Sequence, residues 1–145
     1  MNPFDYPSSP HVRKHGPEGY TDYESFRDWL RDEFSFRCVY CMTRERFMRA
    51  RSMFHIDHFV PVKADSSLTT AYDNLLYCCA PCNLAKGSQP LADPSVSLTP
   101  ETVTVNSDGT IIGKTVESRR TIKKLALDSV DFIEFQRSTN GKIAN

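Results

Sequence analysis

The chain has 145 residues, of which 39% are apolar and 25% charged, and its 18 basic and 18 acidic side chains balance. Mean hydropathy is −0.46, and no run of about 18 apolar residues occurs, which excludes a transmembrane helix. The first residues lack a basic and apolar leader. We therefore expect a cytoplasmic globular protein without membrane contact, whose five cysteines act as metal ligands or reactive thiols rather than disulfides.

The first part of the chain predicts an extended arm followed by a helix. Residues 1–19 contain four prolines and two glycines without apolar periodicity, which is typical of a segment ordered only where it docks. A helix is predicted over 22–34, begun by a capping pattern of Thr21 and Glu24. Apolar side chains at helical spacing indicate core packing rather than a cofactor site: Tyr23, Phe26, Trp29, Leu30 and Phe34.

Basic side chains gather around the first cysteine pair. Residues 37–63 carry six basic and two acidic side chains, and the distribution of charge matters more than its sum. Arg44, Arg46 and Arg49 can grip nucleic-acid phosphates without reading base sequence. The alternative is a solvated basic face, which charge alone favours.

Two strands and a helix are predicted next. Residues 53–62 form a strand ended by Pro61, because proline has no N–H for a sheet ladder. The apolar run 75–79 is a second strand. A short helix over 81–86 follows and ends at Gly87. The expected order is strand, loop, strand, helix.

The last part of the chain predicts a hairpin and two helices. Residues 102–105 and 110–113 read as paired strands joined by a turn. Helical spacing covers 121–127 and 128–137. The expected core residues of these helices are Ile122, Leu125, Val130, Ile133 and Phe135.

Four of the five cysteines have the spacing of a metal site. Cys38 and Cys41 form one C-x2-C pair and Cys79 and Cys82 form another, with 37 residues between the pairs. Two such pairs can converge on one tetrahedral zinc, whose four thiolates leave no open position for a substrate. This predicts one structural Zn²⁺ that staples the two strands and the helix. Cys78 is expected to be a small buried side chain pointing away from Cys79.

The residues between the cysteines carry a family resemblance. The string C-x-Y-C … I-D-H-F-V-P … D-N-L … C-x-x-C-N-x-x-K, from Cys38 to Lys86, resembles the HNH nucleases. The resemblance implies an α+β fold with a zinc-stapled ββα-metal core, an N-terminal helix and a C-terminal β-hairpin with helices. The expected domains are an arm over 1–20, the HNH core over 21–90 and an extension over 91–145.

The resemblance also implies roles for individual residues. Asp57 and Asn83 resemble the two ligands of a catalytic divalent ion, and His58 resembles the general base. Asn74 resembles the loop asparagine that braces the catalytic site. Lys86 matches a lysine position of the family, where a phosphate contact and a solvated helix end are both open.

These residue types suit phosphodiester hydrolysis. Mg²⁺ or Mn²⁺ accepts a carboxylate and an amide oxygen, and a neutral imidazole can take a proton from water near neutral pH. In-line attack would leave a 5′-phosphate and a 3′-hydroxyl. Neighbours on a regular strand face opposite sides, so Asp57 and His58 can reach one phosphate only if the strand bends. His55 is expected to be a substrate contact or a half-buried strand residue.

The expected function is that of a divalent-metal-dependent endonuclease whose substrate is DNA in preference to RNA. A partner protein that supplies sequence specificity is left open. Two alternatives remain. One is a non-catalytic zinc module that binds nucleic acid through its arginines. The other is a zinc-stabilised interaction domain that binds no nucleic acid.

Overall fold

The computed structural model describes Phe4, residues 11–48 and residues 53–143. The chain divides into two compact units, one over 11–91 and one that combines 92–145 with the first ten residues. Helices and small antiparallel sheets make up the described residues, which confirms the α+β class. Among these described helices, none has the length and apolar composition needed to cross a bilayer.

The predicted helix over 22–34 forms as two segments, the 3₁₀ helix η1 (Tyr23–Phe26) and the helix α1 (Arg27–Glu33). Its cap is not the expected Thr21. The side chain of Asp22 accepts a hydrogen bond from Glu24 N at 3.0 Å, because a 3₁₀ start brings that N–H within reach of a carboxylate two residues earlier.

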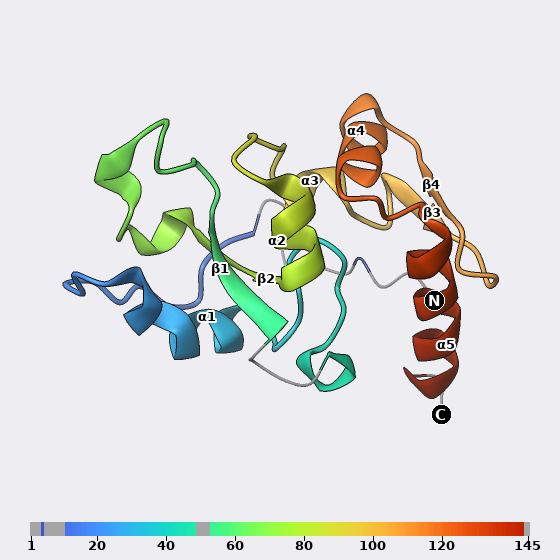
Figure 1. The fold of residues 1–145 in the computed structure, drawn as a ribbon, viewed down its shortest axis with the longest axis horizontal. Helices are drawn as coiled ribbons and strands as arrows, with labels where there is room; N and C mark the ends of the chain where they lie inside the picture. The colour runs from blue at the N-terminus through green and yellow to red at the C-terminus, as the bar shows by residue number, and fades with distance from the viewer. Residues whose placement is uncertain (1–3, 5–10, 49–52, 144–145) are drawn as a thin grey trace. The chain divides into compact units, whose positions relative to one another are not determined.

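The predicted strand–loop–strand–helix order is confirmed (Figure 1). Strand β1 (Phe54–His58) pairs antiparallel with β2 (Leu75–Cys79). Helix α2 (Ala80–Lys86) packs on both strands and ends at Gly87, whose φ is +61°. Short 3₁₀ turns complete this unit at Glu45–Phe47 (η2), Ser66–Leu68 (η4) and Tyr72–Asn74 (η5).

Strand β1 ends at His58, before the Pro61 that was expected to end it. The next two backbone N–H groups leave the ladder and donate to Asn74, Phe59 N to its carbonyl at 2.8 Å and Val60 N to its side-chain Oδ1 at 2.8 Å. An asparagine side chain can replace a strand partner in this way, so the chain turns away from the sheet directly after His58.

An aromatic core lies between α1 and the β1–β2 pair. Phe26 of η1 and Leu30 of α1 are fully buried. Phe54 of β1 stacks on Tyr77 of β2 with ring centroids 4.9 Å apart. The expected stripe holds for Phe26, Leu30 and Phe34, whereas Trp29 remains 41% exposed.

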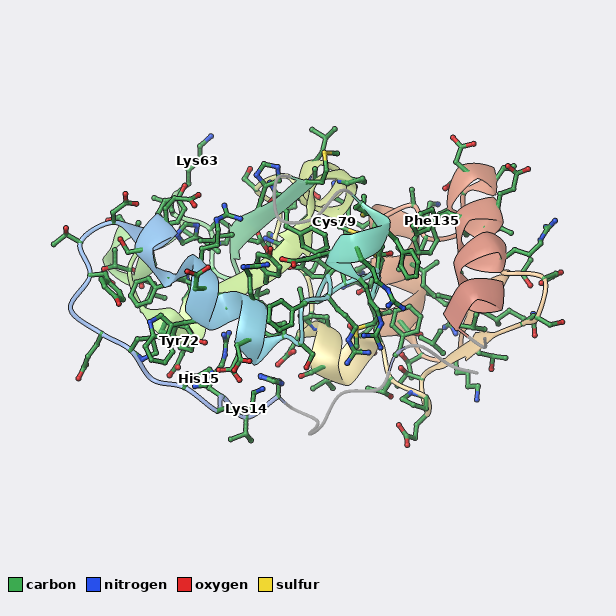
Figure 2. All side chains as sticks on the ribbon, turned by 90° about the horizontal axis from the view of Figure 1, so that it is seen from below. Lys14, His15, Lys63, Tyr72, Cys79 and Phe135 are labelled. Atoms are coloured by element: carbon green, nitrogen blue, oxygen red, sulfur yellow. The ribbon has the colours of Figure 1, made fainter. Side chains whose placement is uncertain are left out.

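The N-terminal segment from His11 to His15 docks on α1 through the buried carboxylate of Glu33. That carboxylate accepts hydrogen bonds from Lys14 N at 2.8 Å and His15 N at 3.1 Å. It also contacts His11 Nε2 at 3.1 Å and accepts from Tyr72 OH at 3.0 Å. Lys14, His15 and Tyr72 accordingly gather beside α1 (Figure 2).

A second buried carboxylate, Glu45 of η2, connects α1 to β2. The guanidinium of Arg31 grips it with two hydrogen bonds, Nε to Oε1 at 2.7 Å and NH2 to Oε2 at 2.9 Å. The hydroxyl of Tyr77 donates to the same Oε1. Burial, together with the hydrogen bond to Glu45, raises the pKa of Tyr77 above its ordinary value, so the phenol remains a donor at neutral pH.

The second unit contains the predicted hairpin and helices. Its elements are α3 (Pro94–Ser97), β3 (Val103–Val105), β4 (Ile111–Gly113), α4 (Val116–Lys124) and α5 (Val130–Ile143). Helix α4 begins five residues before the expected 121. Thr115 and Ser118 form a reciprocal capping box there, and serine in place of the usual Glu or Gln obscured that signal. Ile122 and Leu125 are buried as expected, but Val130 is 71% exposed.

Candidate catalytic and metal site

The four cysteines of the two C-x2-C pairs converge. Cys38 and Cys41 lie on the turn before η2, Cys79 ends β2, and Cys82 lies in the first turn of α2. Their Sγ atoms all lie within 4.8 Å of one another and all four side chains are buried. A tetrahedral Zn²⁺ with Zn–S bonds of about 2.3 Å requires sulfur atoms roughly 3.8 Å apart. The Cys41–Cys79 distance of 3.7 Å fits that requirement.

Backbone hydrogen bonds prepare the first cysteine pair for a metal. Tyr40 N and Cys41 N both point at Cys38 Sγ, at 3.4 and 3.5 Å. Such N–H donors stabilise a thiolate ligand. Val39 N donates to Tyr77 O at 2.9 Å, so the turn is also fastened to β2. The donor set and its surroundings are compatible with a structural zinc that joins the turn, β2 and α2.

Cys78 stands apart from this cluster. It neighbours Cys79 on β2 and is fully buried, as expected for a small apolar side chain. Burial, followed by the neighbouring Cys38 and Asp57, raises the pKa of its thiol well above the ordinary value. The group is therefore a protonated packing residue rather than a nucleophile.

Asp57 of β1 lies in a buried polar cluster. Its residue is 6% exposed. Oδ2 accepts a hydrogen bond from the hydroxyl of Tyr40 at 2.7 Å, and Oδ1 accepts one from Lys86 Nζ at 3.1 Å. Lys86 is itself only 1% exposed, and its ammonium group also donates to His58 O at 3.3 Å. In a buried ion pair of this kind, each charge compensates the other and offsets the cost of removing both from water.

The sequence left two positions open for Lys86, a phosphate contact and a solvated helix end, and the structure contradicts the second. The solvated helix end is wrong, because the ammonium group is buried against Asp57. Tyr40 is a further member of this cluster, because its hydroxyl donates to the same carboxylate. The available signal was general: a buried tyrosine hydroxyl requires a hydrogen-bond partner.

Asp57 and Asn83 are the two residues expected to bind the divalent ion. Asn83 lies three residues before Lys86 on α2 and is half-buried, and residues at this spacing are neighbours on a helix surface. A carboxylate oxygen and an amide oxygen are suitable ligands for Mg²⁺ or Mn²⁺. Each Asp57 oxygen retains a second acceptor direction. The oxygen donors of Asp57 and Asn83 are therefore of the type that a hard divalent ion prefers. Such an ion would share the Asp57 carboxylate with the ammonium group of Lys86.

His58, the last residue of β1, is oriented by two contacts. Its Nε2 lies 3.0 Å from Thr69 O, and its ring meets the ring of Tyr23 edge-on at 4.7 Å. A carbonyl oxygen only accepts hydrogen bonds, so Nε2 carries the proton in this pair. In the neutral imidazole Nδ1 is then unprotonated and able to accept a proton.

Asp57 and His58 contact different parts of the unit. Both remain in regular pairing, Asp57 opposite Leu76 and His58 opposite Leu75. The bend that would turn both side chains to one phosphate is not present within β1. The chain leaves the ladder only after His58.

Asn74 braces the loop beside His58. Its Oδ1 accepts from Val60 N, and its Nδ2 donates to Val60 O at 3.1 Å and Leu68 O at 3.3 Å. Leu68 precedes the residue whose carbonyl contacts His58. Asn74 thus holds both ends of the loop that orients the imidazole.

The arginines proposed as phosphate contacts are only partly described. Arg44 and Arg46 are exposed, and the guanidinium of Arg46 lies 4.9 Å above the ring of Phe47. Arg49 lies outside the described residues. His55 is exposed on β1.

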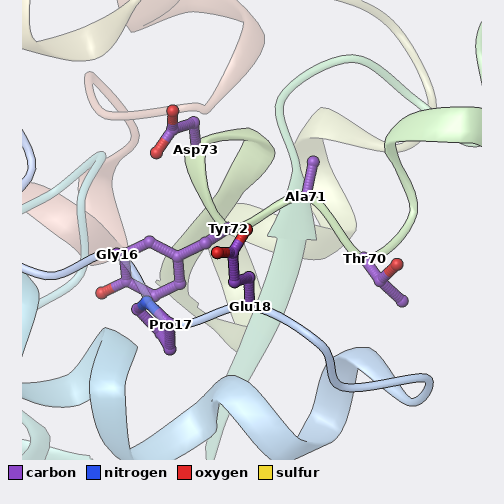
Figure 3. Close-up of a pocket in the computed structure, with 7 residues that line it drawn as sticks. All are labelled: Gly16, Pro17, Glu18, Thr70, Ala71, Tyr72 and Asp73. Atoms are coloured by element: carbon purple, nitrogen blue, oxygen red, sulfur yellow. The ribbon is translucent and has the colours of Figure 1, made fainter.

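A pocket of about 350 Å³ lies between the segments 16–18 and 70–73 (Figure 3). It carries the carboxylates of Glu18 and Asp73. Two carboxylates repel a phosphate group, so this pocket is unsuited to a nucleic-acid backbone.

A cysteine cluster of zinc-site geometry that joins an antiparallel strand pair to a helix, with a histidine at the end of the first strand, defines a small ββα-metal unit. The family model described as HNH endonuclease matches residues 38–89, so this segment is similar to HNH endonuclease domains. The match covers about a third of the chain and confirms the resemblance. No curated protein matches the chain.

Proposed function

We propose that this protein is a divalent-metal-dependent endonuclease that hydrolyses phosphodiester bonds in DNA. The observation that carries the proposal is the hydrogen bond between His58 Nε2 and Thr69 O within the HNH-matched segment. It leaves Nδ1 as the basic nitrogen at the end of β1. A positioned base of this kind accelerates water attack roughly 10²–10⁴-fold.

Each residue then has one role. His58 accepts a proton from the attacking water at Nδ1. Asn74 keeps the loop that supplies Thr69 O in place. Asp57 and Asn83 would hold the catalytic Mg²⁺ or Mn²⁺, which when bound supplies positive charge to the scissile phosphate and the leaving oxygen. Because β1 is regularly paired through His58, this role requires β1 to bend between Asp57 and His58 when substrate binds. Arg44, Arg46 and Arg49 contact backbone phosphates without reading sequence. In-line attack leaves a 5′-phosphate and a 3′-hydroxyl.

The direct test is plasmid cleavage by the full chain with Mg²⁺, with Mn²⁺ and without a divalent ion. We expect nicking or linearisation only with an ion, and nicks that DNA ligase reseals, because ligase requires a 5′-phosphate beside a 3′-hydroxyl. No cleavage under any of these conditions would contradict the proposal.

The ligand assignment needs a variant that preserves the buried cluster. Asp57→Ala would leave the ammonium group of Lys86 buried without its counter-ion, which is strongly destabilising. Asp57→Glu keeps the negative charge that compensates Lys86 and keeps carboxylate oxygens, displaced by the extra methylene group. We expect this variant to cleave slowly, with partial recovery as the Mn²⁺ concentration is raised. Equal loss at every ion concentration would remove Asp57 from the ligand set.

A second candidate function is a zinc-stabilised module that binds nucleic acid without cutting it. The observation that favours it is the Asp57–Lys86 ion pair, which already neutralises the carboxylate proposed for the ion. DNA binding by the wild type without cleavage in Mg²⁺ or Mn²⁺ would establish this candidate over the nuclease.

A further inference from the structure

Helix α4 of the second unit has a basic outer face. The helix advances about 100° per residue, so four basic side chains gather within one arc of its circumference. Arg119, Arg120 and Lys123 are exposed and Lys124 is half-buried. We call these four residues the α4 basic face. Arg119 and Lys124, the first and last of them, are five residues apart along the helix, which corresponds to about 8 Å.

The opposite side of α4 packs on the rest of the second unit. This packing turns the α4 basic face toward solvent. Ser118, Thr121 and Ile122 are buried, and the capping box of Thr115 and Ser118 fixes the start of the helix. A Cβ on Gly113 of β4 would lie 2.8 Å from Arg119 Cγ. Such close approach shows that α4 rests directly on the hairpin.

The four charges lack compensation. Within the described part of the chain, no side chain of the α4 basic face takes part in an ion pair. Arg119 and Lys123 are spaced i,i+4, as are Arg120 and Lys124, and like charges at that spacing repel. Cations in the last turn favour the helix dipole, which accounts for Lys123 and Lys124. It does not account for Arg119 and Arg120, which precede that turn.

We propose that the α4 basic face binds the phosphate backbone of duplex DNA. Duplex DNA carries one negative charge per about 1.7 Å of its axis, so a rigid helix with four cations in about 8 Å matches a dense line of phosphates. Contacts to phosphate fix position without reading sequence. The choice of DNA rests on the proposed function; the surface itself lies outside the HNH-matched segment and does not depend on the site chemistry.

The test measures the salt dependence of binding to a short duplex of arbitrary sequence, with the full chain and without added Mg²⁺ or Mn²⁺, so that no cleavage occurs. The test variant is R119Q/R120Q. If both arginines contact phosphates, the slope of log K against log salt should become shallower by about 2. Two such contacts correspond to about a tenfold change in affinity over a fourfold change in salt.

Two control variants separate a local contact from a general charge effect. R119K/R120K keeps both charges and should bind like the wild type, because phosphate contacts here depend on charge. K14Q/R137Q removes the same net charge from two exposed positions outside α4 and should change the slope by much less. Melting curves and helix content of the two α4 variants should match the wild type, since Arg119 and Arg120 are exposed.

The proposal is overturned if R119Q/R120Q binds with the affinity and slope of the wild type. It is also overturned if R119K/R120K loses as much as the glutamine variant, or if K14Q/R137Q gives the same change of slope. Absence of plasmid cleavage would contradict the proposed nuclease while leaving this binding result unaffected, so the two failures are distinguishable.

Discussion

Asp57, Lys86 and Tyr40 form a buried polar cluster in which one carboxylate accepts from an ammonium group and from a tyrosine hydroxyl. Asp57 and Lys86 are 29 residues apart, and a lysine in the last turn of a short helix is ordinarily solvated. Only the packing of α2 on β1 brings the ammonium group to the carboxylate. The sequence identified both residues but not their relation.

Lys86→Met tests this relation. The methionine fills a similar volume but leaves the Asp57 carboxylate without its cation, so the free energy of unfolding should fall by about 3–5 kcal/mol. If Asp57 also binds the catalytic ion, added Mn²⁺ should restore part of the lost stability, because a ligand that binds only the folded state stabilises it. The measurement is thermal or urea unfolding with and without Mn²⁺.

The exposed Lys63 provides the matched control for that variant. Lys63→Met should change stability by no more than about 0.5 kcal/mol, with no selective response to Mn²⁺. A Lys86→Met variant as stable as the wild type would contradict the buried ion pair. A large loss that Mn²⁺ leaves unchanged would argue against Asp57 as an ion ligand.

At the scale of elements, Glu33 fastens the N-terminal segment to α1. Burial alone would raise the pKa of its carboxyl. Hydrogen bonds from Lys14 N, His15 N, His11 and Tyr72 outweigh that effect, and the pKa lies below the ordinary value of 4.5. A lowered folded-state pKa contributes stability above the ordinary value, and that contribution is lost as the pH falls through the lowered value.

Glu33→Gln should therefore destabilise the protein at neutral pH by about 1–3 kcal/mol, because a carboxylate that accepts several hydrogen bonds is replaced by an amide that also presents donors. The difference from the wild type should shrink below pH 4.5. Urea unfolding at neutral and acid pH measures this. Asp32→Asn, at an exposed carboxylate, is the control and should change stability by less than about 1 kcal/mol. A difference that stays constant into acid would refute the role of Glu33.

The zinc site makes a second prediction at this scale. Cys41→Ser should release the zinc and unfold most of the unit over 11–91, because metal binding energy of about 10–16 kcal/mol is part of the folding energy of such sites. Cys78→Ser, at a buried thiol outside the cluster, should retain one zinc per chain. Elemental analysis and circular dichroism of both variants test this. Zinc retained by Cys41→Ser, or lost equally by both, would contradict the assignment of ligands.

Apolar alternation and turn residues in the sequence correctly predicted the elements whose bounds depend on neighbouring residues. The strand run at 75–79, the stop of α2 at Gly87 and the hairpin of β3 and β4 follow from alternation and turn residues, and the structure confirms them. The predicted start of α4 was wrong because the helix begins at a serine-based cap. The predicted burial of Val130 was wrong because burial depends on tertiary packing. The bend that Asp57 and His58 would need to reach one phosphate would also require a tertiary cause, and β1 remains paired through His58.

At the scale of the whole molecule, the residues that stabilise the fold differ from the residue proposed as the catalytic base. The cysteine cluster, Glu33 and Glu45 hold the unit over 11–91 together. His58 contributes only a half-buried imidazole at the end of a strand, and its hydrogen bond goes to a backbone carbonyl that Asn74 already positions. The HNH-matched segment accounts for about a third of the sequence, and the second unit supplies a separate basic helix.

The measurement that tests the central claim most directly is plasmid cleavage by His58→Ala beside the wild type, with zinc content and melting curve recorded on the same samples. We predict one zinc per chain, a melting curve close to that of the wild type, and cleavage reduced roughly 10²–10⁴-fold by loss of the base. Cleavage at the wild-type rate would contradict the assignment of the nuclease site to His58. Unfolding to the extent of Cys41→Ser would instead make His58 a structural residue.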